Sequence, residues 1–507
     1  MRCHMVRACL TAAVSLWLPV APAAEPHGTL RIATPIIAPQ LSNPYPGLSL
    51  PSTIAVIPVF DPLVVIDGEG RVRPWLALSW VSQDARTWII ALRPGVTFSN
   101  GAPLTADALV ASAAYLQTPK GATTTTGSTF ANLDRVAATG SLTAEIHLKQ
   151  PDPLFPQRLA AWKLPEPKTW ALSVDVDGDG RGIGSGPFVM AEASPSRVVM
   201  MANSRSWNQP RSAKLEIHLL PEQMTRMQAL AAGTIDIAMQ IGPGDREELQ
   251  ALGGRPLNRR TYRVSYVSFA KEHAPNSPIA DTRVRLALNY AINRQAIAEK
   301  ILGGTVTPVG QLVLPGAPGY VTGLGSFPYD PAKARALLAA AGYDKGLALT
   351  VRVAPGGADE ATFYQRIAQD LAAVNVKLTI VPAAMTEMSR MMFQGDFKAD
   401  MFANFGRGLD GLGDYRYRSC LGQAGIYKPY FCDPVSLGYV RQAQAATEAA
   451  EVDRLMQVVT RREYDNPPGI FLWQNNFIDG AGPRVAEAPD YDAYYDYIPL
   501  HRISLKN

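Results

Sequence analysis

The spacing of apolar and polar residues predicts a set of short strands in the first part of this chain. An apolar run, Val59–Ile66, ends at a turn, Asp67–Gly70. The alternating stretch Thr87–Leu92 predicts a strand. After a Pro-Gly turn, Val96–Phe98 is expected to pair back onto it as a β-ribbon that ends at an Asn-Gly turn. Thr105 then has the position of a helix N-cap.

Strand and helix patterns also recur near the N-terminus and in the second half. Leu30–Thr34 is the expected first strand. Leu347–Val353 and Lys377–Val381 predict strands on either side of a helix over Phe363–Val374, and Asp400–Phe405 is another strand-like run. This mixture of strands and helices predicts an α/β fold.

Composition favours two lobes and argues against a nucleic-acid partner. A chain of 507 residues with 47% hydrophobic content can bury two substantial cores. The 48 basic and 44 acidic residues are too evenly balanced for a nucleic-acid-binding surface to be indicated.

The first 24 residues have the pattern of a cleavable signal peptide. Arg2 and Arg7 form its charged region, Ala8–Pro19 its apolar core, and Ala21-Pro22-Ala23 its cleavage pattern. Cys9 lacks the surroundings of a lipoprotein site, so we expect an exported, periplasmic protein without a lipid anchor. No later stretch reaches about eighteen uninterrupted apolar residues, so no transmembrane helix is expected.

Two motifs resemble sites of known chemistry. Asp175, Asp177 and Asp179 reproduce half of a calcium loop, but Gly186 stands where the bidentate Glu belongs, which favours a solvated turn and leaves calcium binding open. Gly406–Gly411 satisfies G-x-G-x-x-G, but the Tyr- and Arg-rich Leu412–Ser419 that follows does not suit a dinucleotide-binding helix. A flexible loop lining a pocket is the favoured interpretation.

Catalytic spacing signals are missing from the sequence. It contains no H-E-x-x-H and no G-x-S-x-G pattern, and the histidines outside the signal peptide are scattered singly. We therefore expect a protein that is not an enzyme.

Five segments share the sequence patterns of one known family: residues 59–112, Gly184–Phe188, Ala229–Ile237, Asp281–Arg294 and Tyr329–Tyr343. They resemble the peptide/nickel class of periplasmic solute-binding proteins, family 5, which serve ABC importers. The resemblance covers almost the whole exported chain. Asn293 departs from the family, which usually has Asp there.

The resemblance implies a two-lobed periplasmic-binding-protein fold of type II, with an extra subdomain in the first lobe and a two-crossing hinge. The chain would cross to the second lobe at Tyr266–Ala270 and return at Ile470–Asp479. The expected domains are a signal peptide (1–24), lobe I (25–265 plus 480–507, with the subdomain at about 59–188) and lobe II (266–479).

The implied function is capture of a small polar solute, a peptide or peptide-like molecule, and its delivery to the permease subunits of an ABC importer. ATP is hydrolysed elsewhere in such a system, so no cofactor is expected, and a monomer is expected. A sugar, an anionic conjugate or a metal chelate remain alternative ligands. An exported enzyme and a sensory or docking module remain alternative functions.

Cys420 and Cys432 are the cysteines left after export, in an oxidising compartment. The loop between them contains Gly422, Gly425 and Pro429 and can fold back, and related proteins often carry a disulfide of this spacing. The alternative, a metal site, lacks a nearby His to complete four ligands.

The ligand site is expected where the lobes meet. In peptide-binding relatives an Asp after the strand matching Asp400–Phe405 pairs with the ligand's amine, whereas Arg407 stands in this region here. Asp410 or Asp414 could replace that Asp; otherwise neutral or anionic groups are preferred at this end. The predicted wall comprises Asn43, Tyr45, Ser268, Phe269, Asn404, Arg407, Asp410, Asp414, Tyr415, Trp473 and Gln474.

Overall fold

A computed structural model provides the fold. It describes residues 25–37, 41–46, 54–169, 182–242, 244–354, 358–406, 408–409, 411–418, 420, 428–489, 491 and 497–506. The predicted signal peptide, the Asp175–Asp179 motif, Arg407 and Asp410 lie outside these ranges, as does the side chain of Asp414.

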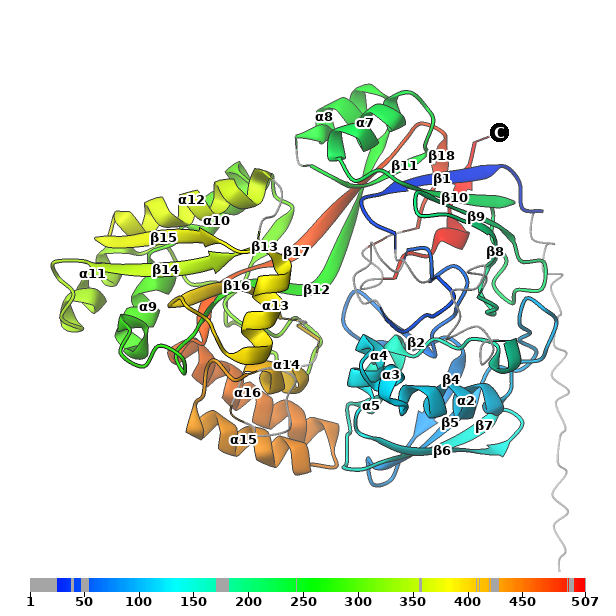
Figure 1. The fold of residues 1–507 in the computed structure, drawn as a ribbon, viewed down its shortest axis with the longest axis horizontal. Coiled ribbons are helices and arrows are strands. Elements are labelled where there is room, and N and C mark those ends of the chain that lie inside the picture. Colours follow the sequence, from blue (N-terminus) through cyan, green and yellow to red (C-terminus); the bar gives the residue numbers. More distant parts are fainter. Residues whose placement is uncertain are drawn as a thin grey trace, which may run out of the picture.

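Two lobes are joined by two long strands, β12 (Arg255–Phe269) and β17 (Gly469–Ala481) (Figure 1). From here on, lobe I denotes the chain before β12 together with the tail after β17, and lobe II denotes the chain between them. The elements of lobe I are β1 (Thr29–Thr34), β2 (Val64–Ile66), β3 (Val72–Pro74), β4 (Ala77–Val81), β5 (Thr87–Leu92), α2 (Ala106–Leu116), α3 (Pro119–Ala122), α4 (Thr125–Thr129), β6 (Leu133–Gly140), β7 (Thr143–Leu148), α5 (Phe155–Arg158), η1 (Leu159–Ala161), β8 (Phe188–Ala193), β9 (Arg197–Ala202), β10 (Lys214–Leu219), α7 (Gln223–Ala231), β11 (Ile237–Ile241), α8 (Asp245–Ala251), β18 (Val485–Glu487), η4 (Leu500–Arg502) and β19 (Ser504–Leu505).

Lobe II contains strands and helices in near alternation, as the sequence predicts. Its elements are η2 (Pro278–Ala280), α9 (Thr282–Tyr290), α10 (Arg294–Lys300), β13 (Val306–Pro308), α11 (Pro331–Ala340), β14 (Leu347–Val353), α12 (Ala358–Ala372), β15 (Val376–Pro382), α13 (Met385–Gln394), β16 (Met401–Gly406), α14 (Gly411–Arg418), α15 (Pro434–Ala445) and α16 (Ala449–Asp465). No helix in the described ranges combines the length and apolar character needed to cross a membrane.

One mixed sheet runs through both lobes in the order β15-β14-β16-β12-β17-β11-β1-β10-β9-β8. β12 and β17 are antiparallel neighbours, with Arg255 opposite Ala481 at one end and Val267 opposite Ile470 at the other. β11 pairs with the lobe I end of β17, and β16 pairs with the lobe II end of β12. The register of β12 and β17 shifts between Arg260 and Val264, within the crossing. The lobes are therefore connected by two hydrogen-bonded strands.

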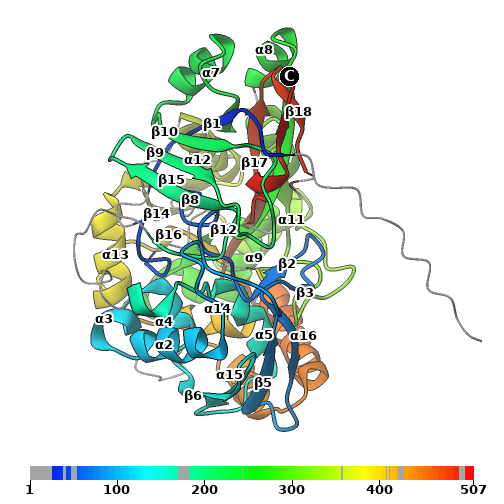
Figure 2. The ribbon, with the colours of Figure 1, turned by 90° about the vertical axis from the view of Figure 1, so that its right-hand side faces the viewer.

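The core of lobe I brings a second sheet, β4-β5-β7-β6, together with α2 and part of the main sheet. Figure 2 shows lobe I from its outer side, with β8, β9 and β10 above α2, α3 and α4. The strand predicted at Thr87–Leu92 is confirmed as β5. The predicted pairing with Val96–Phe98 is wrong, because β5 lies between β4 and β7 and Thr97 forms only an isolated bridge with Pro103.

The core of lobe II packs helices against β14, β15 and β16. β14 pairs in parallel with β15, and α12 between them is amphipathic, with Ile367 and Leu371 in the core. The strand predicted at Leu347–Val353 matches β14 in both bounds. The buried residues of β12 and β17, such as Phe269 and Trp473, belong to the same core.

The two lobes also touch directly. Leu154, just before α5, is 4% exposed and packs with Leu412, Tyr415 and Met456 of lobe II. In a second contact, Ile66 of β2 packs against the lobe II cluster that includes Leu409. α3, α4 and α5 lie on the side of lobe I that faces α14 and α16 (Figure 1). The structure therefore shows the lobes in contact.

Two glycines meet where these lobes touch. Gly70 follows β2 in lobe I, Gly316 lies in lobe II, and both have positive φ, 80° and 86°. A Cβ at Gly70 would lie 3.2 Å from the backbone of Gly316, and a Cβ at Gly316 would collide with the carbonyl oxygen of Glu69. Only glycine allows this close backbone approach.

Candidate functional site

The glycine-rich loop predicted to line the site lies between β16 and α14. Gly408 has a φ of 63°, and a Cβ there would lie 2.7 Å from both the carbonyl oxygen of Tyr262 and the side chain of Leu314. The backbone at Gly408 is therefore packed tightly onto the crossing strand β12. The predicted wall residues Arg407 and Asp410 are outside the described residues, so their placement stays a prediction.

Asn404 and Ser268, two predicted wall residues, are in direct contact below this loop. The Asn404 Nδ2 group lies within hydrogen-bond distance of three hydroxyl oxygens: Ser268 Oγ at 3.0 Å, Tyr266 at 3.1 Å and Tyr430 at 3.0 Å. Its two hydrogens are shared among these acceptors. The two tyrosine hydroxyls are 2.8 Å apart. Burial raises the pKa of Tyr430 above its usual value, so this hydroxyl stays neutral. The cluster fixes the end of β16 against β12.

Tyr415, another predicted wall residue, lies over a buried ion pair. The Arg418 guanidinium is 5.0 Å from the Tyr415 ring centre and donates to Glu463 Oε1 at 2.7 and 3.2 Å. Although burial acts in the opposite direction, the Glu463 carboxylate raises the pKa of Arg418, which holds the guanidinium charged. The Arg418 carbonyl oxygen accepts from the backbone N–H groups of Tyr430 and Phe431. These bonds place α14 beside the hydroxyl cluster.

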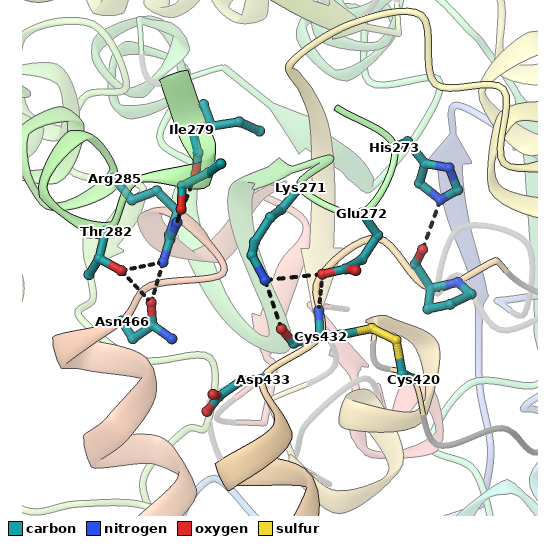
Figure 3. A network of polar contacts seen from close by, with 12 residues as sticks. Lys271, Glu272, His273, Ile279, Thr282, Arg285, Cys420, Cys432, Asp433 and Asn466 are labelled. Atoms are coloured by element: carbon teal, nitrogen blue, oxygen red, sulfur yellow. Dashed lines mark hydrogen bonds and ion pairs between the residues drawn. A yellow bond between two sulfur atoms is a disulfide. The ribbon is translucent and has the colours of Figure 1, made fainter. Parts of the chain in front are cut away.

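The disulfide lies beside Glu272, a residue of the segment that follows β12 (Figure 3). The structure joins Cys420 to Cys432, with their Cα atoms 5.4 Å apart. Cys432 N–H donates to Glu272 Oε1 and Lys271 Nζ donates to the Cys432 carbonyl oxygen, both at 2.9 Å. The segment after β12 therefore holds the segment that carries the disulfide.

Glu272, Cys420 and Cys432 also place three potential metal-ligand atoms within 4.8 Å of one another in the described part of the chain. With the two sulfur atoms bonded to each other, neither is a thiolate, which is the form that binds a metal. In this oxidised form the group lacks the donors that a metal site needs.

The predicted residues at the crossing are mostly buried. Trp473 is 2% exposed and meets the Phe363 ring edge to face, 5.0 Å between centres. Gln474 donates to the Thr261 carbonyl oxygen at 2.7 Å. Phe269 is fully buried in the core of lobe II. In this arrangement these side chains support the crossing strands.

On lobe I, the two predicted residues Asn43 and Tyr45 face inward. Asn43 Nδ2 donates to the Tyr115 hydroxyl at 3.0 Å, and Asn43 Oδ1 accepts from Tyr45 N–H at 3.0 Å. The Tyr45 ring is fully buried, and its hydroxyl donates to the Lys163 carbonyl oxygen at 2.9 Å. The structure thus brings Ser268, Asn404 and Tyr415 into one neighbourhood, whereas Asn43 and Tyr45 lie in the core of the other lobe.

Sequence reasoning missed an arginine–phenylalanine pair on the crossing strand. The Arg263 guanidinium lies 4.1 Å from the centre of the Phe405 ring, and Phe405 at the end of β16 is 50% exposed. Within the described ranges, no carboxylate pairs with Arg263. The only sequence signal for this pair was an Arg-rich run before Tyr266, which does not show which arginine is paired.

Comparison with known proteins identifies the family. A family model described as "Bacterial extracellular solute-binding proteins, family 5 Middle" matches residues 71–421, more than half of the chain. The chain belongs to this family of bacterial extracellular solute-binding proteins. The strand crossing and the two-lobed architecture of this family 5 protein agree with that membership.

Two curated relatives match part of the family 5 chain. The nickel-binding periplasmic protein of Escherichia coli K12 is 30% identical over 295 residues, 56% of each chain. The glutathione-binding protein GsiB of Salmonella paratyphi A is 28% identical over 352 residues, 67% of this chain and 66% of the relative. The matched part thus spans between about half and two-thirds of these relatives.

Solved structures confirm the predicted fold class. The ABC transporter substrate-binding protein CtaP of Listeria monocytogenes has a TM-score of 0.83 at 20% identity, with 95% of this chain and 100% of that chain covered. NikA of Brucella suis, in complex with Fe(III)-EDTA, has a TM-score of 0.79 at 22% identity, with 94% and 100% covered. At these identities the likeness supports the fold.

Proposed function

We propose that this family 5 protein is an extracytoplasmic receptor that captures a small polar solute between its lobes and delivers it to an ABC importer. The observation that carries the proposal is the pair of crossing strands, β12 and β17, which connects two lobes that each have their own core. Such a connection permits hinge closure around a ligand. Two relatives, a nickel-binding periplasmic protein and a glutathione-binding protein, support the same function.

The proposal includes several properties that the fold alone does not determine. These are a peptide or peptide-like ligand, a cleaved signal peptide without a lipid anchor, a periplasmic location, a monomeric state, and permease subunits as partners. Binding without turnover is part of the proposal, so the chain is not an enzyme. The lobe boundaries and the wall residues predicted from the sequence also remain part of it.

Arg263 favours a ligand with a neutral or anionic group near the crossing. Its guanidinium is half-buried, has no carboxylate partner in the described ranges, and lies on the half-exposed Phe405 ring. A cation in such a place attracts an acidic group and repels a free ammonium. An anionic conjugate or an acidic metal chelate is therefore the second candidate ligand class, beside a peptide.

Mass spectrometry of small molecules released from the purified, denatured protein tests the function. A retained peptide, acidic conjugate or metal complex is the expected result. Small-angle scattering with and without the identified molecule then tests closure, with a smaller radius of gyration expected in its presence. Conversion of that molecule into a product would contradict the receptor function.

A further inference from the structure

Lys163 lies on an extended segment whose neighbours point into the core of lobe I. Trp162 and Leu164 are both fully buried in that core. Trp162 has extended backbone angles, and Lys163 forms an antiparallel bridge with Pro62. Because successive side chains of an extended chain point to opposite faces, the Lys163 side chain points away from the core that holds Trp162 and Leu164.

The Lys163 ammonium lacks a counter-charge among the described residues. No carboxylate or other hydrogen-bond partner contacts its Nζ in this part of the chain. Burial lowers the pKa of Lys163 from 10.5 to about 8, and no nearby charge opposes this effect. The residue is half-buried, so its side chain lies partly among protein atoms without entering the core of its own lobe.

Two buried cations of the chain differ from Lys163 in having partners. Arg294 donates to the carbonyl oxygens of Phe471 and Asn289, and Arg418 donates to the Glu463 carboxylate. Partly burying a charge without a partner costs free energy, and a structural role gives no reason to keep it. A role in ligand binding does give a reason, because an acidic group of the ligand would be the missing partner of the Lys163 ammonium.

The surroundings of Lys163 place it near lobe II. It is the second residue after η1, and its bridge partner Pro62 lies just before β2. Two side chains of lobe I that pack against lobe II come from the same region: Ile66 belongs to β2, and Leu154 immediately precedes α5. α5 lies on the side of lobe I that faces α14 and α16 (Figure 1).

We propose that the Lys163 ammonium binds an acidic group of the solute and is the anchor for that group on lobe I. The inference rests on the proposed receptor function and deepens it, since it assigns at least one carboxylate or comparable anion to the solute. Lys163 was not among the residues predicted from the sequence, where it stands singly between apolar residues.

Two pairs of probes that differ in carboxylate charge test the assignment by calorimetry. They are glutathione with its diethyl ester, and trialanine with its amide. The variant Lys163→Met keeps most of the apolar stem and removes the charge, and Lys163→Arg keeps the charge. Lys149→Met is the matched control, because the Lys149 Nζ donates to the Ala131 carbonyl oxygen at 3.0 Å on the surface of lobe I.

The expected result is an at least tenfold weaker binding of the acids to Lys163→Met, with Lys149→Met unchanged and Lys163→Arg between the two. The ligand-free Lys163→Met variant should melt at the same temperature as the wild type or higher, because a half-buried charge without a counter-charge has been removed. A lower melting temperature would mark Lys163 as structural and overturn the inference.

Other outcomes separate this inference from the receptor function. Equal binding of the acids by wild type and Lys163→Met overturns the Lys163 assignment and leaves the receptor function standing. Tighter binding of the neutral probes than of the acids by the wild type likewise overturns the Lys163 assignment and leaves the receptor function standing. If the wild type binds none of the four probes, the proposal that the solute is acidic and peptide-like is overturned. The receptor function is then tested only by mass spectrometry of the molecule released from the denatured protein.

Discussion

At the residue scale, the Arg418–Glu463 pair shows how strongly the neighbourhood of the glycine-rich loop depends on one charge. We expect Glu463→Gln to lower the free energy of unfolding by about 3–5 kcal/mol, because it leaves the buried Arg418 without a counter-charge. Denaturant unfolding measures the change. The control Glu451→Gln removes an exposed partner of Arg454 and should have little effect. Equal effects of both variants would contradict the role given to burial.

Asp433 provides a test by pH. Although burial acts in the opposite direction, hydrogen bonds from Arg462 and Ser436 lower its pKa from 3.8 to about 2. Because the folded pKa is depressed, the stabilisation is complete above about pH 4 and is lost as the pH falls through about 2. It amounts to roughly 2 kcal/mol. Unfolding at stepped pH should therefore show a shallower acid dependence for Asp433→Asn; equal slopes would be the contrary result.

At the element scale, the disulfide links Cys420, just after α14, to Cys432, just before α15. Cys420 and Cys432 are separated by 12 positions, so closing this loop should contribute roughly 3 kcal/mol in the chain-entropy model. Thiol titration of the unfolded, unreduced protein should detect no free thiol. Replacing both cysteines by serine should lower the unfolding midpoint. Two reactive thiols in the untreated protein would contradict the pairing.

The sequence predicts a helix or strand well when the pattern that defines it lies within that element alone, and poorly when its partners come from distant parts of the chain. The alternation of Leu347–Val353 lies within one strand, and β14 has those bounds. The pairing of Val96–Phe98 was wrong because the partners of β5 come from before and well after it in the chain. Asn404 was predicted at the glycine-rich loop and Ser268 at the first crossing; the two side chains are in contact, while their role in a ligand site stays a prediction. Lys163 and Arg263 carry no local signal, since the absence of a carboxylate beside either one, among the described residues, depends on the packing of distant segments.

At the scale of the whole molecule, the glycine contact between the lobes tests closure. Gly316→Ala should weaken solute binding and increase the radius of gyration of the solute-bound protein, because a Cβ there would collide with the Glu69 carbonyl oxygen of lobe I. Gly323→Ala is the control, since Gly323 has a similar φ of 83° but open space around it. Small-angle scattering and calorimetry compare the two variants. Equal behaviour would mean that the glycine contact plays no part in closure.

Because Gly70 and Gly316 meet through their backbones, the limit of lobe closure would be set by the chain and not by the solute. Solutes of different sizes would then lead to the same closed shape. An oversized solute would be rejected through lost affinity instead of producing a partly closed form. A permease that recognises this shape would respond equally to every solute that allows it to form, so selectivity would lie in the receptor's affinities alone.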